Sequence, residues 1–285
     1  MKKKINWIVS YPKSGNTWLR AIMSSFLFTT DGVFNLGLLK LIEQFEKKKW
    51  FNFVLNVDEI SNKKLSDIKL ISKYWLEAQE KIIIEDNYNF FHNFFKTHSL
   101  FANLDGNEFT NEQITNGIIY IIRDPRDIAV SFSKHMGQDI NSTIDFMINK
   151  SAMFPADEDR VPTLLSRWDY HYISWQKINV PKILIKYEDL ISETKKNLKK
   201  IHNFIKLDLK IEIESNEVII KNIYNTTHFN KLQEYEKQKG FSEATKNSVF
   251  FREGKSMQWK NILSTNQIKR IEKEFSPIMK KLDYL

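Results

Sequence analysis

The chain has 285 residues, which is long enough for one large α/β domain or two small ones. Hydrophobic residues make up 42%, so a sizeable core is expected and wholesale disorder is not. Cysteine is absent, which excludes disulfides, thiolate nucleophiles and cysteine-ligated metals. The net charge of +8 suits an anionic partner, although the lysines are dispersed as on solvated helix faces and no nucleic-acid-binding module is recognised.

No apolar run approaches the ~18 residues of a membrane span. The apolar part of the N-terminal stretch ends at Pro12, which is too short for a signal peptide. We therefore expect a cytoplasmic protein without a membrane span. Because the chain has no linker, repeat or low-complexity tract, residues 1–285 are expected to form a single domain.

Four short apolar runs, at residues 5–10, 90–96, 118–123 and 183–187, are expected to form buried strands. Helical patterns lie between them. One helix is expected to begin at Asp124-Pro125, and amphipathic helices are expected at residues 192–205 and 266–282. Strands that alternate with helices predict an α/β fold with a parallel sheet covered on both faces, and ligands bind at the carboxyl ends of such strands.

The first predicted strand leads through a small-residue loop into a helix. Gly15 allows a tight turn and a close approach of the backbone, and Lys13 adds a positive charge. Ser14, Asn16 and Thr17 add donors beside the helix amides, so the loop predicts an anion cradle. The nucleotide motif G-x-x-x-x-G-K-[ST] is absent, and no metal-holding acid follows the later strands, so we expect no magnesium. The alternative is an ordinary turn with an exposed lysine.

Two further strand ends carry charged residues. Arg123 ends one predicted strand and Ser131 lies one turn into the next helix, a pair that could hold a second phosphate. Alone, Arg-Asp-Pro-Arg-Asp is more often a surface ion-pair cluster. Lys96 and His98 follow another strand, and His98 at the edge that holds two anion cradles is a candidate general base rather than a structural histidine.

These residues resemble the sulfotransferases that use 3′-phosphoadenosine-5′-phosphosulfate (PAPS). The family's 5′-phosphosulfate loop, Y-P-K-S-G-[TN]-T-W, matches residues 11–18. Its 3′-phosphate motif, R-[ND]-x-[RK]-D-x-[AV]-V-S, matches residues 123–131, and its K-T-H strand end matches residues 96–98. The Y-E-D turn near the adenine matches residues 187–189, and the late R-x-G-x-x-x-x-W-K motif matches residues 252–260.

The resemblance runs in order from residue 5 to about 265. It implies a P-loop-like three-layer fold, with a central mainly parallel sheet flanked by helices, and one sulfotransferase domain over residues 1–285. It also implies transfer of a sulfuryl group from PAPS to a hydroxyl of a small-molecule acceptor, with an amine as the alternative acceptor. The product would be 3′,5′-bisphosphoadenosine, and no metal would be required.

The resemblance implies catalytic roles for four residues. His98 would take the acceptor's proton, Lys13 would stabilise the departing phosphate oxygen, and Lys96 would hold the transferring group. Ser131 would contact the 3′-phosphate and restrain Lys13. The implied cofactor-binding residues are Lys13, Ser14, Gly15, Asn16, Thr17, Trp18, Arg123, Ser131, Tyr187, Thr227, Phe229, Phe251, Arg252, Glu253 and Gly254.

Two departures from the family pattern stand out. Glu253 puts a negative charge beside the expected 3′-phosphate, where Lys255 could restore the positive charge. The dimerisation motif of the animal enzymes, K-x-x-F-T-V-x-x-x-E, is matched only in part at residues 260–269, which leaves the oligomeric state open. Trp168, His171 and Trp175 repeat the spacing of a family helix, and we interpret them as packing residues.

Three other functions remain as alternatives: a P-loop-type kinase, a non-catalytic binder of 3′-phosphoadenosine nucleotides, and a basic nucleic-acid-binding protein. The acceptor pocket is expected to be walled by residues 31–60 and 136–165. Their large apolar side chains predict an acceptor with an apolar body: Phe34, Leu38, Trp50, Phe53, Met136, Met147, Met153 and Phe154.

Overall fold

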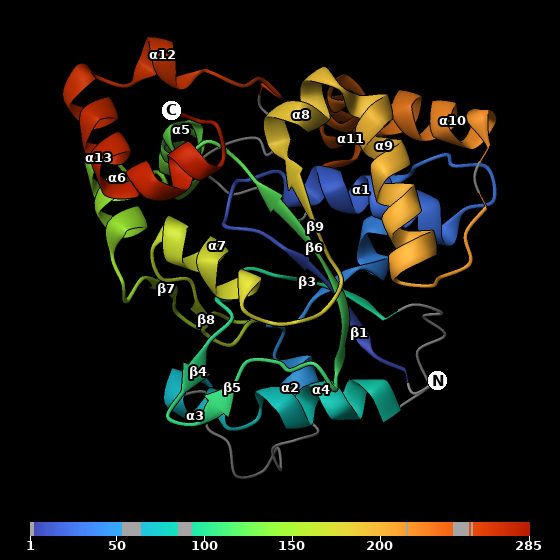
Figure 1. Ribbon diagram of the computed structural model, residues 1–285, viewed down its shortest axis with the longest axis horizontal. Helices are drawn as coiled ribbons and strands as arrows, with labels where there is room; N and C mark the ends of the chain where they lie inside the picture. The colour runs from blue at the N-terminus through green and yellow to red at the C-terminus, as the bar shows by residue number, and fades with distance from the viewer. Residues whose placement is uncertain (1–2, 53–63, 85–92, 215, 242–250, 252) are drawn as a thin grey trace.

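A five-stranded sheet lies at the centre of the computed structural model, which describes residues 3–52, 64–84, 93–214, 216–241, 251 and 253–285 (Figure 1). The strand order is β2-β3-β1-β6-β9, and every neighbouring pair is parallel. The strands are β2 (Glu43–Gln44), β3 (Phe94–Thr97), β1 (Ile5–Val9), β6 (Thr115–Ile122) and β9 (Lys182–Lys186). The predicted parallel sheet is confirmed. The two-residue strand β2 was not predicted, because two residues show no periodicity.

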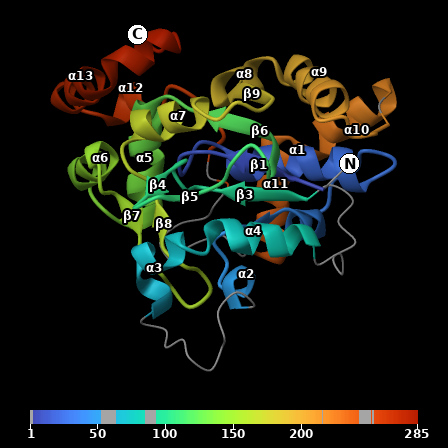
Figure 2. The same ribbon diagram turned by 60° about the horizontal axis from the view of Figure 1, so that its bottom comes forward.

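The side chains of the central strands alternate between two cores, one on each face of the sheet. Trp7 and Val9 of β1 join Tyr120 of β6 in the first core, whereas Ile8 joins Ile121 in the second. Helices α4 (Trp75–Ile84), α5 (Pro125–Met136), α7 (Trp168–Gln176) and α13 (Thr265–Lys281) contribute to the first core. Helices α1 (Asn16–Phe28), α9 (Thr194–Asn203), α10 (Glu217–Thr227) and α11 (Phe229–Lys239) contribute to the second and lie together in Figure 2. The predicted three-layer arrangement is confirmed.

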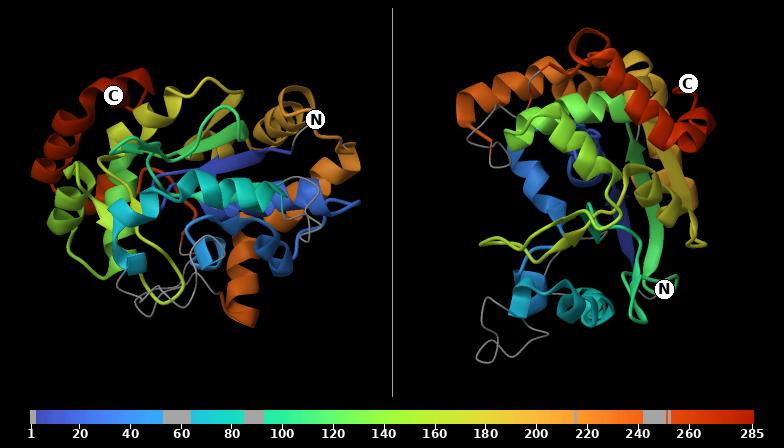
Figure 3. Two further views of the ribbon diagram at one scale, coloured as in Figure 1. Left: turned by 90° about the horizontal axis from the view of Figure 1, so that it is seen from below. Right: turned by 90° about the vertical axis from the view of Figure 1, so that its left-hand side faces the viewer.

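The remaining elements are short, apart from α6, which lies beside α13 (Figure 3). They are α2 (Lys49–Asn52), α3 (Ile68–Ser72), α6 (Ile140–Ile148), α8 (Tyr187–Ser192), α12 (Trp259–Ile262), the 3₁₀ helices Leu36–Leu41 and Lys64–Ser66, the π-helical turn Phe204–Asp208, and the antiparallel pairs β4 (Asn103–Leu104) with β5 (Asn107–Glu108) and β7 (Met153–Phe154) with β8 (Thr163–Leu164).

Local capping explains where the helices begin. Asp124 caps α5 by accepting a hydrogen bond from the Arg126 amide, and Pro125 takes the first helical position, as predicted. Ser264 and Gln267 form a capping box that starts α13. The predicted helix at residues 192–205 is wrong at its start, because Glu193 has a non-helical backbone conformation and separates α8 from α9.

Candidate active site

A cavity of about 1020 Å³ opens at the carboxyl ends of β1, β3 and β6. The structure brings most of the predicted site residues to its lining. Among the described residues these are Lys13, Gly15, Asn16, Thr17, Trp18, Lys96, His98, Arg123, Ser131, Tyr187, Phe229, Phe251, Glu253 and Gly254.

Two predicted cofactor residues in the described ranges are not part of this lining. Ser14 is fully buried behind it, and its Oγ has no hydrogen-bond partner among the described residues. Thr227 is also buried, and its hydroxyl donates to the Ile223 carbonyl of its own helix at 2.7 Å. Arg252 lies outside the described residues. Lys255 is exposed and is not among the described lining residues, whereas the exposed Glu253 is.

The loop before α1 is held in a conformation that suits an anion. Lys13 and Gly15 both adopt positive φ, at 65° and 98°. A Cβ at Gly15 would lie 2.6 Å from the Tyr187 ring, so only glycine fits this turn without a shift. Gly15 is the N-cap of α1 and offers no side-chain acceptor to the first amides of the helix, an arrangement in which helix N-termini bind anions.

Arg123 joins three segments at the second anion cradle. Its Nη1 donates to the Lys13 carbonyl at 3.3 Å and its Nη2 donates to the Lys255 carbonyl at 3.0 Å. Its guanidinium lies 4.3 Å from the centre of the Tyr187 ring. Its Nε is buried and has no hydrogen-bond partner among the described residues, so one donor of this cation is unsatisfied.

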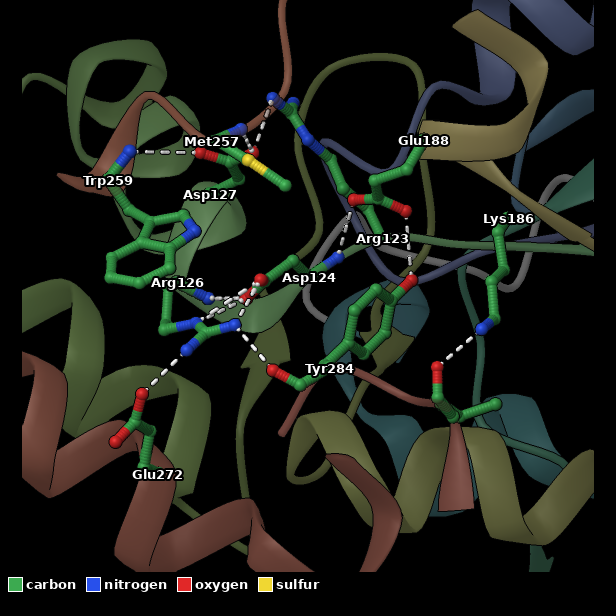
Figure 4. A network of polar contacts seen from close by, with 11 residues as sticks. Arg123, Asp124, Arg126, Asp127, Lys186, Glu188, Met257, Trp259, Glu272 and Tyr284 are labelled. Atoms are coloured by element: carbon green, nitrogen blue, oxygen red, sulfur yellow. Dashed lines mark hydrogen bonds and ion pairs between the residues drawn. The ribbon is translucent and has the colours of Figure 1, made fainter. Parts of the chain in front are cut away.

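Asp127 fixes the segment that contributes Gly254 to the cavity. Its carboxylate accepts the amides of Met257 at 2.7 Å and Trp259 at 3.1 Å, and lies 3.7 Å from Arg123 (Figure 4). Burial raises the pKa of Asp127, although Arg123 and the two amides act in the opposite direction. Gly254 lies so close to Phe229 that a Cβ would be 2.2 Å from that ring.

His98 is anchored through Nδ1, which lies 2.8 Å from the Ser10 carbonyl and 3.2 Å from Ser10 Oγ. Because a carbonyl can only accept, Nδ1 carries the proton and the lone pair of the neutral ring is on Nε2. Asn16, the first residue of α1, donates to the same Ser10 hydroxyl at 3.2 Å. Ser10 therefore connects the histidine to the helix that follows the first cradle.

Helix α7 holds the backbone at His98 and Ser99 through two hydrogen bonds. The sequence analysis interpreted His171 and Trp175 as packing residues and did not predict these bonds. His171 Nε2 donates to the His98 carbonyl at 2.9 Å, and Trp175 Nε1 donates to the Ser99 carbonyl at 2.9 Å. Tyr120 Oη lies 2.7 Å from His171 Nδ1 and donates to it. Burial lowers the pKa of His171 to about 4, so this ring is neutral near pH 7.

A buried carboxylate supports the same segment from another element. Glu46 is 2% exposed, and its Oε1 accepts hydrogen bonds from the hydroxyls of Thr97 and Ser99, which flank His98. Its Oε2 is buried without a partner among the described residues. No sequence signal marks Glu46, because β2 brings it to β3 from about fifty positions away.

The neutral His171 makes stability depend on pH. The unfolded histidine protonates near its ordinary pKa of 6.5 and the folded one only near 4, so the unfolded state binds more protons between these values. Stability should therefore fall as the pH falls through this window, by on the order of 2–3 kcal/mol. Urea unfolding at several pH values checks this. The dependence of the unfolding free energy on pH should weaken in His171→Gln. It should persist in His228→Gln, which changes an exposed histidine.

The acceptor side of the cavity differs from the predicted apolar wall. Of the eight predicted wall residues, only Phe154 is part of the described lining. Phe34, Trp50 and Met147 are buried in the two cores, and Phe53 lies outside the described residues. From the two predicted wall segments the described lining includes Leu36, Gly37, Leu39, Gln44 and Phe154, together with five charged residues that form a charged wall: Lys40, Glu43, Lys47, Asp159 and Arg160.

Two chain segments build this charged wall. The Lys48 amide donates to the Asp159 carbonyl at 2.8 Å, and the Val161 amide donates to the Glu46 carbonyl at 2.9 Å. Burial alone would raise the pKa of Glu43, but Lys47 and Lys49, each 2.6 Å away, lower it. Glu43 is therefore ionised and paired at neutral pH.

Within the described ranges, no three His, Asp or Glu side chains are grouped so that they could hold a metal ion. None of the helices in these ranges has the length and apolar character needed to cross a bilayer.

The sheet order and the loop between β1 and α1 define a P-loop-like α/β protein, and the side chains of Lys13, Lys96 and Arg123 are among those that line its cavity. The chain belongs to the sulfotransferase family, because the family model described as the sulfotransferase domain matches residues 4–283. The flavonol 4′-sulfotransferase of Flaveria chlorifolia is 25% identical over 279 residues, which cover 94% of this chain and 76% of that protein. Sulfotransferase 2A1 of Rattus norvegicus is also 25% identical over 279 residues, which cover 95% and 83% of the two chains.

Solved structures show the same fold. A crystal structure of retinol dehydratase in a complex with retinol and PAP aligns with a TM-score of 0.59 at 18% identity, covering 98% of this chain and 82% of that one. The mouse sulfotransferase SULT7A1 complexed with PAP aligns with a TM-score of 0.54 at 17% identity, covering 100% and 86%. The predicted family, fold class and enzyme class are confirmed.

Proposed function

We propose that the chain transfers the sulfuryl group of PAPS to a hydroxyl of a small-molecule acceptor and releases 3′,5′-bisphosphoadenosine (PAP). One observation carries the proposal: the two anion cradles and His98 open into the same cavity. The relatives named for flavonols and steroids, and the similar folds crystallised with PAP, support it.

The residues present fit this co-substrate. Gly15 and Gly254 let the rings of Tyr187 and Phe229, which line the cavity, pack directly on the backbone, and the buried Nε of Arg123 still needs an acceptor. When bound, PAPS supplies the sulfuryl group and a phosphate leaving group. The loop at residues 13–17 and the amides of α1 would hold the 5′-phosphate, and Arg123 and Ser131 would hold the 3′-phosphate.

Three residues of the chain take separate roles in the reaction. His98 uses its Nε2 lone pair to take the acceptor's hydroxyl proton, while its Nδ1–H stays on the Ser10 carbonyl. Lys13 stabilises the negative charge that develops on the leaving oxygen. Lys96, on the same strand end as His98, holds the transferring group. Most of the rate enhancement comes from positioning and electrostatics, as in phosphoryl transfer.

The charged wall guides the choice of acceptor. A wholly apolar acceptor would remove Lys47 and Arg160 from water and leave them only their ion-pair partners Glu43 and Asp157, which is costly. We therefore propose a small hydroxylated acceptor that carries polar substituents, in place of the apolar body expected from the sequence.

Transfer of label tests the proposed reaction. The protein is incubated with ³⁵S-labelled PAPS and a panel of hydroxylated acceptors, in which each apolar member has a polar-substituted counterpart. We expect labelled product that is formed best with the polar-substituted members and that is lost in His98→Ala. Binding of PAP without transfer to any acceptor would instead favour the non-catalytic binder.

Arg123 should set the preference for the 3′-phosphate. Arg123→Ala should narrow the affinity gap between PAP and adenosine 5′-phosphate by ~1.5–3 kcal/mol, the range for a charge-assisted hydrogen bond. Calorimetric titration of both nucleotides measures the gap. Arg270→Ala, which removes an exposed arginine that pairs with Asp145, is the matched control. An unchanged gap in Arg123→Ala would place the 3′-phosphate elsewhere.

A further inference from the structure

A closed ring of polar contacts joins Tyr284 to the segment that follows Arg123 (Figure 4). Tyr284 Oη donates to Glu188 Oε2 at 3.0 Å, and Glu188 Oε1 accepts the Asp124 amide at 3.0 Å. The Asp124 carboxylate binds Arg126 Nη2 at 2.7 Å, and the same Nη2 donates to the Tyr284 carbonyl at 2.7 Å. The four residues therefore hold one another in place.

Asp124 and Arg126 of the ring are buried and form an ion pair, whereas Glu188 and Tyr284 are half-buried. Asp124 and Arg126 are each 6% exposed. Arg126 also binds Glu272 of α13 at 2.5 Å and lies 3.9 Å from the centre of the Trp259 ring. Burial raises the pKa values of both Glu188 and Tyr284. Loss of one donor would leave a buried carboxylate oxygen without its partner, so the ring should shift rather than simply lose a contact.

The members of the ring adjoin the groups that hold Arg123. Asp124 is the next residue in the chain, and Glu188 follows Tyr187, whose ring lies under the Arg123 guanidinium. Arg126 stacks on Trp259, whose amide is bound by Asp127. Displacement of this ring of polar contacts would thus move both the strand end that carries Arg123 and the Tyr187 side chain beneath its guanidinium.

We propose that Tyr284 is a positioning residue for the contact between Arg123 and the 3′-phosphate. Tyr284 is not among the described residues that line the cavity, so it acts through Glu188 and Asp124. The inference rests on the proposed function, because it takes the 3′-phosphate to be the ligand of Arg123.

Tyr284→Phe tests the proposal, since it removes only the hydroxyl and keeps the carbonyl that Arg126 binds. PAP and adenosine 5′-phosphate are titrated into the full chain by calorimetry. We expect PAP to bind about three- to tenfold more weakly and adenosine 5′-phosphate to change by less than about twofold. Tyr170→Phe, at an exposed tyrosine of α7, is the matched control and should change neither affinity.

Substitutions of Glu188 separate positioning from general stability. Glu188→Gln should preserve the preference for PAP, because an amide can accept from Asp124 and donate to the Tyr284 hydroxyl. Glu188→Ala should reproduce the Tyr284→Phe effect, and the double variant should be no weaker than the worse single one.

Equal weakening of both nucleotides in Tyr284→Phe, or no weakening of either, would overturn the positioning role. A wild-type protein that binds PAP no more tightly than adenosine 5′-phosphate would overturn the proposed function itself, and this inference with it.

Discussion

Replacing His98 by alanine should lower kcat by ~10²–10⁴ while PAP binds within about twofold of the wild-type affinity. The imidazole is fixed by Nδ1 on the Ser10 carbonyl, and the His98 carbonyl is fixed by His171, so the ring is held at the cavity in one orientation, as the proposed base requires. Because the proposed base would act on the acceptor, its loss should affect the chemical step and leave the cofactor cradles intact. Labelled-PAPS turnover and calorimetric titration of PAP measure the two quantities separately.

The control is His202→Ala on α9, which changes a histidine that does not line the described cavity and should leave kcat near the wild-type value. If His98→Ala retained near-normal turnover, another group would have to remove the acceptor proton. A variant that lost PAP affinity in proportion to its rate would point to a structural defect at the carboxyl end of β3 rather than to a missing base.

The parts of the site that lie next to one another in the sequence could be predicted. Lys13 and Gly15 lie in one loop that leads from a strand into a helix, so their pattern alone indicates an anion cradle. Arg123 and Ser131 share the end of one strand and the first turns of the next helix. The residues next to one another in the sequence are enough to predict these two groups. All four residues line one cavity in the structure.

The supporting contacts could not be predicted, because they join distant segments. Glu46 meets Thr97 and Ser99 only because β2 pairs with β3. Tyr284 reaches Glu188 across almost one hundred positions, and nothing around either residue indicates the contact.

The predicted acceptor wall was right in its two segments, which both contribute to the described lining, but wrong in most of its named side chains, for a related reason. Composition shows that Phe34 and Trp50 are apolar, but it does not show that they face the cores while Glu43 and Lys47 face the cavity. Which side chains of an irregular segment turn inward depends on tertiary packing, which a short segment without periodicity does not reveal.

Lys13→Met should lower kcat by ~10²–10³, because it withdraws the positive charge from the oxygen on which negative charge develops. The residue has φ of 65°, and its carbonyl accepts a hydrogen bond from Arg123, so its backbone is fixed by the second cradle. Methionine keeps an unbranched side chain that is one atom shorter, and it preserves the backbone contact. The change should therefore act on the transition state, with only a modest loss of PAP affinity.

Lys13→Arg should not restore activity, even though it restores the charge. A guanidinium is a planar fork that cannot reproduce the compact charge of an ammonium at the base of a tight loop. Single-turnover rates with labelled PAPS, together with PAP titrations, compare the two variants, and Lys199→Met at an exposed lysine paired with Glu217 is the control. Full activity in Lys13→Arg would contradict the point-charge role. If Lys13→Met lost as much PAP affinity as rate, Lys13 would be a ground-state binding residue, because only an interaction stronger in the transition state lowers kcat beyond its effect on binding.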